Sequence, residues 1–511
     1  MMKHILVLNM GMKSIRSIIF SADGEKLAYA ARPLETYLDA DYVLQSPDEW
    51  WEKARTVIRE SLVDVGKENI GYITVTTSSS CLVYVDAQGR ALAKCIMVSD
   101  KRGEAEKADL AENPVFQRME SRESMGPGAY PMLLKMLWLQ KHEPEIFAQV
   151  YKFLSPNDFL LAKMTGRYVT DGLDASKSHY DATAGSYPAE LFASLGFRME
   201  TFPEVLPIGS NLGPLTEEAA DYLDLSPDTQ AVLTTYDAIC SFFGSGVSQE
   251  GEASDVSGTV TVFRALSQKQ DLQPNREIFI MPYPEMGMHI VGGSNNLGGG
   301  LIEWVKQCYY QNETYPYEVM EKDASEARLG ADGVIFLPYL LGERAPIWNP
   351  DARGVFFGLE RMHTRKEMTR AVFESTGFID LDMIRAIEKT GMTVHTIRLS
   401  GGLARLNLIS QIKADITGRD IEVLSEFETT STGAAMLALT GVGRFRDLHE
   451  AAACFATVRM IIKPNAANHR KYLQMYQLYR DTYSSLKGMF RERMDIVRSL
   501  NHKHEVRIEN L

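Results

Sequence analysis

The sequence predicts an α/β protein built from two similar domains, and three observations support this. The chain has 511 residues, more than one hydrophobic core normally organises. A strand–turn–strand unit followed by alternating strands and helices begins near the first residue and begins again near Glu252. No long linker or low-complexity segment interrupts these two rounds. We therefore expect domains over residues 1–248 and 249–511, with a ligand cleft between them.

The first round opens with strand patterns at 5–8 and 15–20, joined by a tight turn. Ser46, Pro47 and Glu49 then have the order of a helix start: an N-cap, a first-turn proline and an acid that reaches back. The remaining patterns of this round are a strand at 26–31, a helix through 62, strands at 70–92 and 96–98, helices from 131, a loop-rich segment at 168–196 and a strand at 231–234.

The second round repeats these patterns after residue 252. Residues 253–265 predict a strand, a Gly-Thr turn and a second strand. Thr364 and Glu367 predict a capping box that opens a long helix. The other patterns are a strand, glycine-rich turn and helix at 288–307, a strand ending in glycines at 395–402, a helix closed by Gly418, and an amphipathic helix at 472–497.

Composition restricts the partners and the compartment. The chain has 54 basic and 67 acidic side chains, a formal charge of −13, which argues against nucleic acid or an anionic membrane as partner. Its five cysteines are scattered, without metal-like spacing, as expected in a reducing compartment. Residues 1–30 lack a signal-peptide pattern, and no apolar run approaches the roughly 18 residues of a membrane helix. We expect a cytoplasmic enzyme.

Asp237 is the first residue that could carry chemistry. It follows a short apolar strand and precedes a helix of small residues, a position at which α/β folds place reactive groups. A carboxylate there could accept a proton from a hydroxyl nucleophile. The alternative is an aspartate that caps the helix, which is common.

Three glycine-containing turns could approach phosphates. The turn with Gly11, Lys13 and Ser14 resembles a phosphate grip, but it contains no carboxylate to hold a metal. Gly258 and Thr259 form a turn between strands, for which an ordinary hairpin is the alternative. Glycines in the segment 400–407 lie between a strand and a helix, where a ligand can approach the backbone, or where they simply allow close packing.

Two further regions are polar or unusually long. Asp100, Arg102 and the run 76–80 follow neighbouring strands and could hold a polyol, or they could be solvated strand ends. The loop 337–359 is long for a compact domain, which favours a functional role. In the structural alternative, Glu343 in this loop pairs with a neighbouring arginine, Arg344 or Arg353.

Together these segments resemble the FGGY family of carbohydrate kinases, in order and over most of the chain. The loop LPYLLGERAPIWNPDARGVFFGL is similar to the family's signature loop, and SGGLARLNLISQIKADITG to its adenosine motif. IMVSDKRG resembles the sugar-site strand, with Val98 in place of a tryptophan. STGAAMLA and SPDEWWEKA also match. The gluconate and xylulose kinase-like branch is the most similar.

The resemblance implies two actin-like ATPase (ribonuclease H-like) domains with an inter-domain cleft. It implies transfer of the γ-phosphate of ATP to a hydroxyl of a xylulose- or gluconate-like substrate, with Mg²⁺ and with Asp237 as the general base. The resemblance implies three sets of site residues. The substrate site holds Ser79, Ser80, Asp100, Arg102, Asp237 and Asn296, and the metal site holds Asn9, through water, and Asp237. The ATP site holds Gly11, Lys13, Ser14, Gly258, Thr259, Gly299, Gly401, Gly402 and Asn407.

The first phosphate turn departs from the family pattern Asp-x-Gly-Thr-(Thr/Ser)-Ser. Asn9 replaces the acid, and a neutral amide is a weaker ligand for Mg²⁺. We hypothesise that Lys13, which replaces a hydroxyl, contacts the phosphates directly. The alternative is a turn that has decayed, in a sugar- and nucleotide-binding sensor or scaffold that no longer transfers phosphate. The run 78–80 also replaces a Gln-Met-His common in pentulose kinases, and a homodimer is a further possibility.

Overall fold

The computed structural model describes residues 3–39, 42–119, 130–283, 287–426 and 428–508. They fold into two compact units. The first unit comprises Met1–Ser248, Met281–His289 and Glu428–Thr457, and the second comprises Gln249–Ile280, Ile290–Phe427 and Val458–Leu511. The division at residue 248 remains a prediction about domains, but the compact units are discontinuous, because the segment Glu428–Thr457 packs with the first unit.

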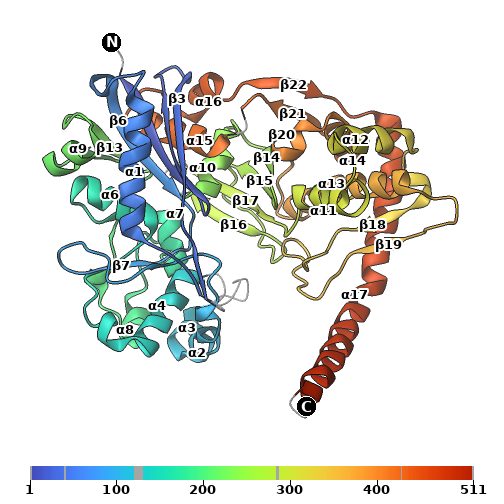
Figure 1. The fold of residues 1–511 in the computed structure, drawn as a ribbon, viewed down its shortest axis with the longest axis horizontal. Helices are drawn as coiled ribbons and strands as arrows, with labels where there is room; N and C mark the ends of the chain where they lie inside the picture. The colour runs from blue at the N-terminus through green and yellow to red at the C-terminus, as the bar shows by residue number, and fades with distance from the viewer. Residues whose placement is uncertain (1–2, 40–41, 120–129, 284–286, 427, 509–511) are drawn as a thin grey trace. The chain divides into compact units, whose positions relative to one another are not determined.

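A mixed sheet forms the centre of the first unit (Figure 1). Its strand order is β12-β13-β6-β1-β2-β3. The parallel neighbours β1, β6 and β13 place their carboxyl ends at one edge of the sheet. The strands are β1 (His4–Met10), β2 (Ser14–Phe20), β3 (Lys26–Pro33), β6 (Ile70–Thr77), β12 (Asn211–Pro214) and β13 (Gln230–Val232).

Two helices of the first unit, α10 (Asp237–Gly244) and α15 (Thr429–Gly441), cross with their backbones in contact. A Cβ atom added at Gly433 would lie 1.7 Å from the Cys240 carbonyl oxygen, and one added at Gly244 would lie 1.8 Å from the Thr429 carbonyl oxygen. Only glycine fits at these two positions. The crossing therefore fixes the first turn of α15 beside α10.

The second unit is built around the strand order β15-β14-β20-β21-β22. The pair β14 and β15 is antiparallel, β14, β20 and β21 run parallel, and β22 is antiparallel to β21. These strands are β14 (Glu252–Ser257), β15 (Thr261–Ser267), β20 (Thr396–Gly401), β21 (Asp420–Leu424) and β22 (Val458–Ile462). The antiparallel hairpin beside parallel strands repeats the pattern of the first unit, as the sequence predicts.

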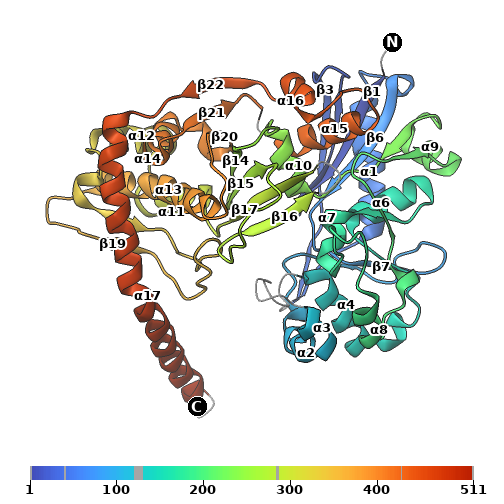
Figure 2. The same ribbon diagram turned by 180° about the vertical axis from the view of Figure 1, so that it is seen from behind.

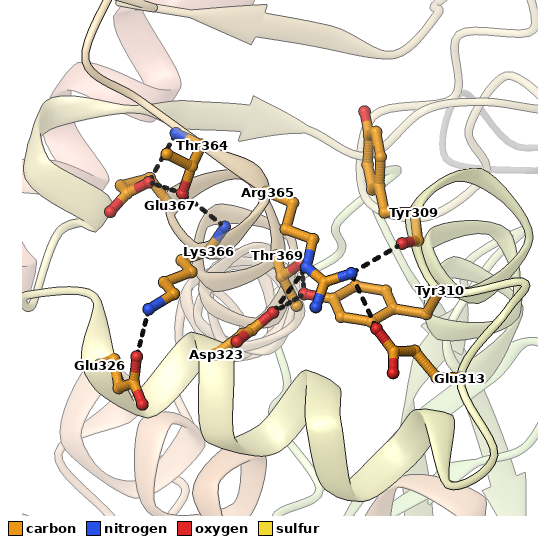
Figure 3. Close-up of polar contacts among 10 residues, drawn as sticks. All are labelled: Tyr309, Tyr310, Glu313, Asp323, Glu326, Thr364, Arg365, Lys366, Glu367 and Thr369. Carbon is orange, nitrogen blue, oxygen red and sulfur yellow. Dashed lines mark hydrogen bonds and ion pairs between the residues drawn. The ribbon is translucent and has the colours of Figure 1, made fainter.

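The predicted capping box at Thr364 is confirmed. Helix α13 (Arg365–Glu388) begins with the Thr364 side chain accepting a hydrogen bond from the Lys366 backbone, while Glu367 accepts one from the Thr364 backbone at 2.7 Å (Figure 3). The first residue of α13 attaches it to helix α12 (Pro316–Glu326): Arg365 Nε donates to Asp323 Oδ2 at 2.8 Å. The cap and this ion pair thus define where α13 starts.

Removing the cap tests its contribution. We expect Thr364→Ala to lower the free energy of unfolding by about 1 kcal/mol, because a donor at the N-terminus of α13 loses its partner. Urea denaturation measures the loss. As a matched control, Thr56→Ala removes an exposed threonine inside helix α1 (Pro47–Leu62) and should be neutral or slightly stabilising. Equal effects of both changes would contradict the role of the cap.

Three local expectations differ from the structure. Ser46 caps α1 as predicted, but Glu49 Oε1 accepts a hydrogen bond from the Glu35 backbone at 3.0 Å instead of reaching back to the cap. The segment 168–196 contains short regular elements, which a pattern of three to six residues does not reveal. The tail helix α17 (Ala466–Ile508) is longer than expected, and Figures 1 and 2 show its C-terminal part extending away from the rest of the second unit.

The remaining elements complete the two units. The strands are β4 (Tyr37–Asp39), β5 (Tyr42–Gln45), β7 (Val83–Val85), β8 (Cys95–Ile96), β9 (Lys152–Leu154), β10 (Val169–Asp171), β11 (Glu204–Leu206), β16 (Phe279–Tyr283), β17 (Met288–Ser294), β18 (Ile335–Leu337) and β19 (Val355–Phe357). The helices are α2 (Glu106–Glu112), α3 (Pro114–Met119), α4 (Pro131–His142), α5 (Pro144–Phe147), α6 (Pro156–Thr165), α7 (Gly172–Ala175), α8 (Ala189–Ser194), α9 (Glu217–Leu223), α11 (Gly299–Tyr309), α14 (Asn407–Thr417) and α16 (Leu448–Phe455). Within the described ranges, no helix combines the length and the apolar character needed to cross a membrane.

Candidate active site

The carboxyl edge of the first sheet brings together three regions that the sequence singles out. The first phosphate turn follows β1, Ser78 follows β6, and Asp237 comes five residues after β13. The Ser78 backbone donates to the Met10 carbonyl at 3.3 Å, and Ser78 Oγ donates to Asp237 Oδ2 at 3.1 Å. The predicted base therefore lies beside the strand that leads into the predicted phosphate turn.

Asp237 is the first residue of α10, and Tyr236 occupies the N-cap position. The alternative interpretation, that Asp237 is the helix cap, is therefore wrong. The strand end before it is held by buried threonines: Thr76 Oγ1 donates to the Thr235 carbonyl at 2.9 Å, and Thr234 Oγ1 donates to the Val75 carbonyl at 2.8 Å. These hydrogen bonds fix the backbone that positions Asp237.

Behind this strand end lie buried carboxyl groups that the sequence analysis did not anticipate. Thr235 Oγ1 donates to Asp171 Oδ1 at 3.1 Å. Burial raises the pKa of Asp171 to about 8, and the neighbouring Asp174 adds to this. Burial also raises the pKa of Asp174 to about 6, which Lys177 partly offsets. Burial therefore favours the neutral, protonated form of Asp171, which reduces the negative charge behind Asp237.

The first phosphate turn is closed by a hydrogen bond from the Gly11 backbone to the Ser14 carbonyl, at 3.0 Å. The Lys13 side chain is exposed, and the Lys13 carbonyl accepts from the Leu34 backbone. Asn9, just before the turn, is only 2 % exposed. Its contact with phosphate or metal remains a prediction, as does that of Lys13.

The predicted substrate residues Ser79 and Ser80 follow β6 in the same loop as Ser78. Their hydroxyl oxygens lie 3.4 Å apart, and Ser80 has a left-handed φ of 63°. Lys135, a buried residue of α4, donates to the Ser80 and Met97 carbonyls. Burial lowers the pKa of Lys135. By donating to these two carbonyls, Lys135 holds the loop that contains Ser80 in place. The sequence patterns did not identify this lysine as a site residue.

Asp100 and Arg102 form a buried bidentate ion pair. Arg102 Nε donates to Asp100 Oδ1 and Arg102 Nη2 donates to Asp100 Oδ2, both at 2.9 Å. The guanidinium group lies over the rings of Tyr42 and Trp138, 4.0 and 4.6 Å from their centroids. The alternative of solvated strand ends is wrong, because the two side chains are 0 % and 5 % exposed. Direct sugar contact by this pair remains a prediction.

In the second unit, the structure brings the second phosphate turn against the start of α11. The Gly299 backbone donates to the Gly258 carbonyl at 2.7 Å, and the Gly298 and Gly300 backbones donate to the Thr259 carbonyl. A side chain at Gly299 would lie 2.8 Å from the Gly258 carbonyl oxygen. Three predicted ATP residues, Gly258, Thr259 and Gly299, are therefore neighbours.

The predicted adenosine residues lie next to the same turn. Gly401 has a φ of 87°, and a Cβ atom there would lie 2.5 Å from the Ser257 carbonyl oxygen. Gly402 and Asn407 are exposed, and Asn407 is the first residue of α14. The glycines thus permit close packing of β20 on the turn after β14, and the exposed positions leave backbone accessible to a ligand.

The long loop holds a buried glutamate. Glu343 Oε1 accepts hydrogen bonds from the Asn296 and Arg344 backbones, at 2.9 and 2.8 Å. Arg353 instead donates to the Pro350 carbonyl. The alternative in which Glu343 pairs with an arginine side chain is therefore wrong, since backbone N–H groups of Asn296 and Arg344 donate to it instead. Asn296 lies in the second unit, and its role at the substrate remains a prediction.

The raised pKa of Glu343 leads us to expect that the free energy of unfolding depends on pH. Burial raises its pKa from 4.5 to about 7, although the two N–H donors lower it. The folded state therefore binds the proton more tightly than the unfolded state, and the free energy of unfolding falls as pH rises from about 4.5 to about 7. We expect the wild type to lose up to about 3 kcal/mol more than Glu343→Gln over this range. Urea denaturation at several pH values measures the difference, and parallel profiles would contradict it.

The residues of the first unit fit Mg²⁺ held mainly by phosphate and water. Asp237 provides a carboxylate and Asn9 an amide, and Glu428, at the N-cap of α15, accepts a hydrogen bond from Asn9. Among the residues that the structure describes, no three or more His, Cys, Asp or Glu side chains form a metal cage. Mg²⁺ bound with nucleotide commonly uses only one or two carboxylates, so this set suits it.

Models of the N-terminal and C-terminal domains of the FGGY family of carbohydrate kinases match residues 4–244 and 253–442. The chain is 27 % identical over 489 residues to a xylulose kinase of Staphylococcus epidermidis, covering 95 % of this chain and 97 % of that protein. It is 24 % identical over 516 residues to a gluconokinase of Bacillus licheniformis, covering 98 % and 100 %. None of these relatives is named as a sensor or scaffold.

Among solved structures, the chain is similar to a ligand-bound xylulose kinase from Lactobacillus acidophilus. The TM-score is 0.87, with 25 % identity, and the match covers 96 % of this chain and 99 % of that one. The predicted fold class, two actin-like ATPase domains, is confirmed.

Proposed function

The chain belongs to the FGGY family of carbohydrate kinases, and we propose that it phosphorylates a xylulose- or gluconate-like substrate with Asp237 as the general base. The activity class, an ATP-dependent sugar kinase, follows from the family. The observation that carries the proposed role is the position of Asp237 at the carboxyl edge of the first sheet, held by Ser78 at 3.1 Å.

In the proposed reaction, a substrate hydroxyl oxygen forms a bond to the γ-phosphorus of ATP. The bond from this phosphorus to the bridging oxygen breaks, and ADP leaves with that electron pair. Asp237 accepts the hydroxyl proton as the new bond forms. Ser78 limits the rotation of the carboxylate by donating a hydrogen bond to its Oδ2 atom.

The remaining site residues are proposed to position the two substrates. Ser79, Ser80, Asp100, Arg102 and Asn296 are proposed to bind or orient the sugar. Gly11, Lys13, Ser14, Gly258, Thr259, Gly299, Gly401, Gly402 and Asn407 bind ATP. When bound, Mg²⁺ neutralises charge on the phosphate oxygens, and the residues proposed to hold it are Asn9, through water, and Asp237.

The substrate class rests on the relatives' names and on the loop after β6. Ser78, Ser79 and Ser80 offer small hydroxyl groups there. A coupled ADP-release assay with ATP and Mg²⁺ tests gluconate and other aldonates, xylulose, ribulose, other ketoses, erythritol and glycerol. We expect a signal with a five-carbon ketose or an aldonate. Silence across the panel would overturn the proposal and favour a binding protein.

We also propose a cytoplasmic location, no nucleic acid or membrane partner, and assembly as a homodimer. The scattered cysteines support the cytoplasmic location. The formal charge of −13 supports the proposal that neither nucleic acid nor a membrane is a partner. Sedimentation velocity tests the assembly, with a single species at the monomer mass as the contradicting result.

A further inference from the structure

A carboxylate from the far end of the sequence lies beside the first phosphate turn. Asn9 Nδ2 donates to Glu428 Oε1 at 2.9 Å and to Ser431 Oγ at 3.0 Å. Arg16 Nη1 donates to the other oxygen, Glu428 Oε2, at 2.7 Å. Arg16 Nε also donates to Ser14 Oγ, inside the turn, at 3.2 Å. Glu428 therefore connects the residue before the turn to the turn itself.

These contacts determine which way the Asn9 amide faces. A carboxylate oxygen accepts hydrogen bonds but has none to donate, so the Asn9 nitrogen must be the atom that faces Glu428. The Asn9 carbonyl oxygen then lies on the opposite side of the amide. An oxygen is the atom that Mg²⁺ or its bound water requires from this side chain.

The position of Glu428 is not explained by helix capping. Glu428 occupies the N-cap of α15, but among the described contacts its side chain makes no capping hydrogen bond to that helix. Its carboxylate accepts hydrogen bonds from Asn9 and Arg16, and also one from the Ser431 hydroxyl of α15 at 3.3 Å. Its side chain is 22 % exposed and that of Arg16 is 28 % exposed, so both remain accessible to a ligand.

The fold holds Glu428 there through the crossing of α10 and α15. Ser241 of α10 and Thr429 of α15 share a hydrogen bond of 2.7 Å between their hydroxyls. The close approach at Gly244 and Gly433 places the start of α15 next to the helix that Asp237 begins. The Glu428 carboxylate therefore has a fixed position relative to both β1 and α10 within the first unit.

We propose that Glu428 supplies the negative charge that the first phosphate turn lacks at Asn9. In this role it is a positioning residue: it orients the Asn9 oxygen toward hydrated Mg²⁺ and holds the Arg16 guanidinium beside the turn. The inference rests on the proposed function only in assuming that this turn binds Mg²⁺–nucleotide. In this proposal, the acid that the phosphate turn lacks comes from Glu428, at the N-cap of α15.

The test measures ADP affinity by titration calorimetry, with and without Mg²⁺, and without any sugar. The ratio of the two dissociation constants reports the metal contribution, whereas a merely structural defect changes both constants together. We expect Glu428→Gln to reduce this ratio about tenfold, the size typical of residues that orient metal ligands. Glu60→Gln is the matched control, because Glu60 pairs with Arg32 at an exposed site of the same unit. It should leave the ratio unchanged.

The double variant Asn9→Asp with Glu428→Gln tests whether one carboxylate, placed at either position, is sufficient for the metal contribution to ADP binding. It exchanges amide and carboxylate while retaining one charge and one hydrogen bond between them. We expect it to restore the ratio to within about threefold of wild type. The single variant Asn9→Asp brings two carboxylates together, where an oxygen pair is 2.9 Å apart in this geometry, and should lower the melting temperature without Mg²⁺ more than with it.

An unchanged ratio in Glu428→Gln would overturn the inference, and so would a double variant no better than Glu428→Gln alone. Absence of Mg²⁺-dependent ADP binding in the wild type would also overturn it. Failure of the proposed function looks different: the wild type would bind Mg²⁺ and ADP normally but phosphorylate no sugar of the panel. The two failures are therefore distinguishable.

Discussion

Asp237→Asn is expected to reduce kcat by between about 10²- and 10⁴-fold, while sugar and nucleotide affinities change little. Asparagine has the shape of aspartate and can still accept the Ser78 hydrogen bond through its oxygen, but it does not accept the hydroxyl proton. Steady-state kinetics measures kcat, and calorimetry measures binding. A loss in kcat with retained affinity is the signature of an interaction made only in the transition state.

Asp224→Asn is the matched control for this prediction. Asp224 lies in the same unit, at the end of α9, and forms an exposed ion pair with Lys67. Its left-handed φ of 59° is one that asparagine also tolerates. We expect unchanged turnover and a stability change below about 1 kcal/mol. Retained turnover in Asp237→Asn would remove Asp237 from the role of general base.

Gly433→Ala is expected to lower the free energy of unfolding by at least about 3 kcal/mol. Its methyl group would lie 1.7 Å from the Cys240 carbonyl oxygen, and this oxygen belongs to the backbone of α10 and cannot rotate away. The two helices must separate to accept it. Because α15 carries Glu428 and α10 begins at Asp237, Mg²⁺-dependent ADP binding should also weaken.

Gly488→Ala is the matched control for this substitution. Gly488 also lies inside a helix, α17, but in the described part of the chain nothing lies within 4 Å of a Cβ atom placed there. Alanine should stabilise this helix by up to about 1 kcal/mol. Urea denaturation followed by circular dichroism compares the two variants. Similar stabilities for both would show that the crossing tolerates a side chain.

Local chemistry explains the predictions that succeeded. Thr364 and Glu367 lie three residues apart, so the capping box depends only on the chain between them. The Gly-Thr turn at 258–259 joins two strands that are adjacent in sequence, and the structure has it there. Motif order over the whole chain identified the family, and the two matching family models confirm this.

The expectations that failed concern which donor a glutamate side chain accepts from. Glu49 bonds the Glu35 backbone instead of its own cap, and Glu343 bonds two backbone N–H groups instead of an arginine side chain. In each case several acceptable partners exist in sequence. Packing decides which donor comes within 3 Å, and no local pattern contains that information.

The sequence by itself determined the family, the alternation of strands and helices, and the residues at strand ends, because these depend on spacing along the chain. Only the tertiary structure decided that Glu428, 419 residues after Asn9, lies beside the first phosphate turn. The physical reason is the glycine contact between α10 and α15, which lets two backbones touch and places a carboxylate next to an amide. The sequence shows a missing acid at Asn9, and the fold shows that the Glu428 carboxylate lies beside that position.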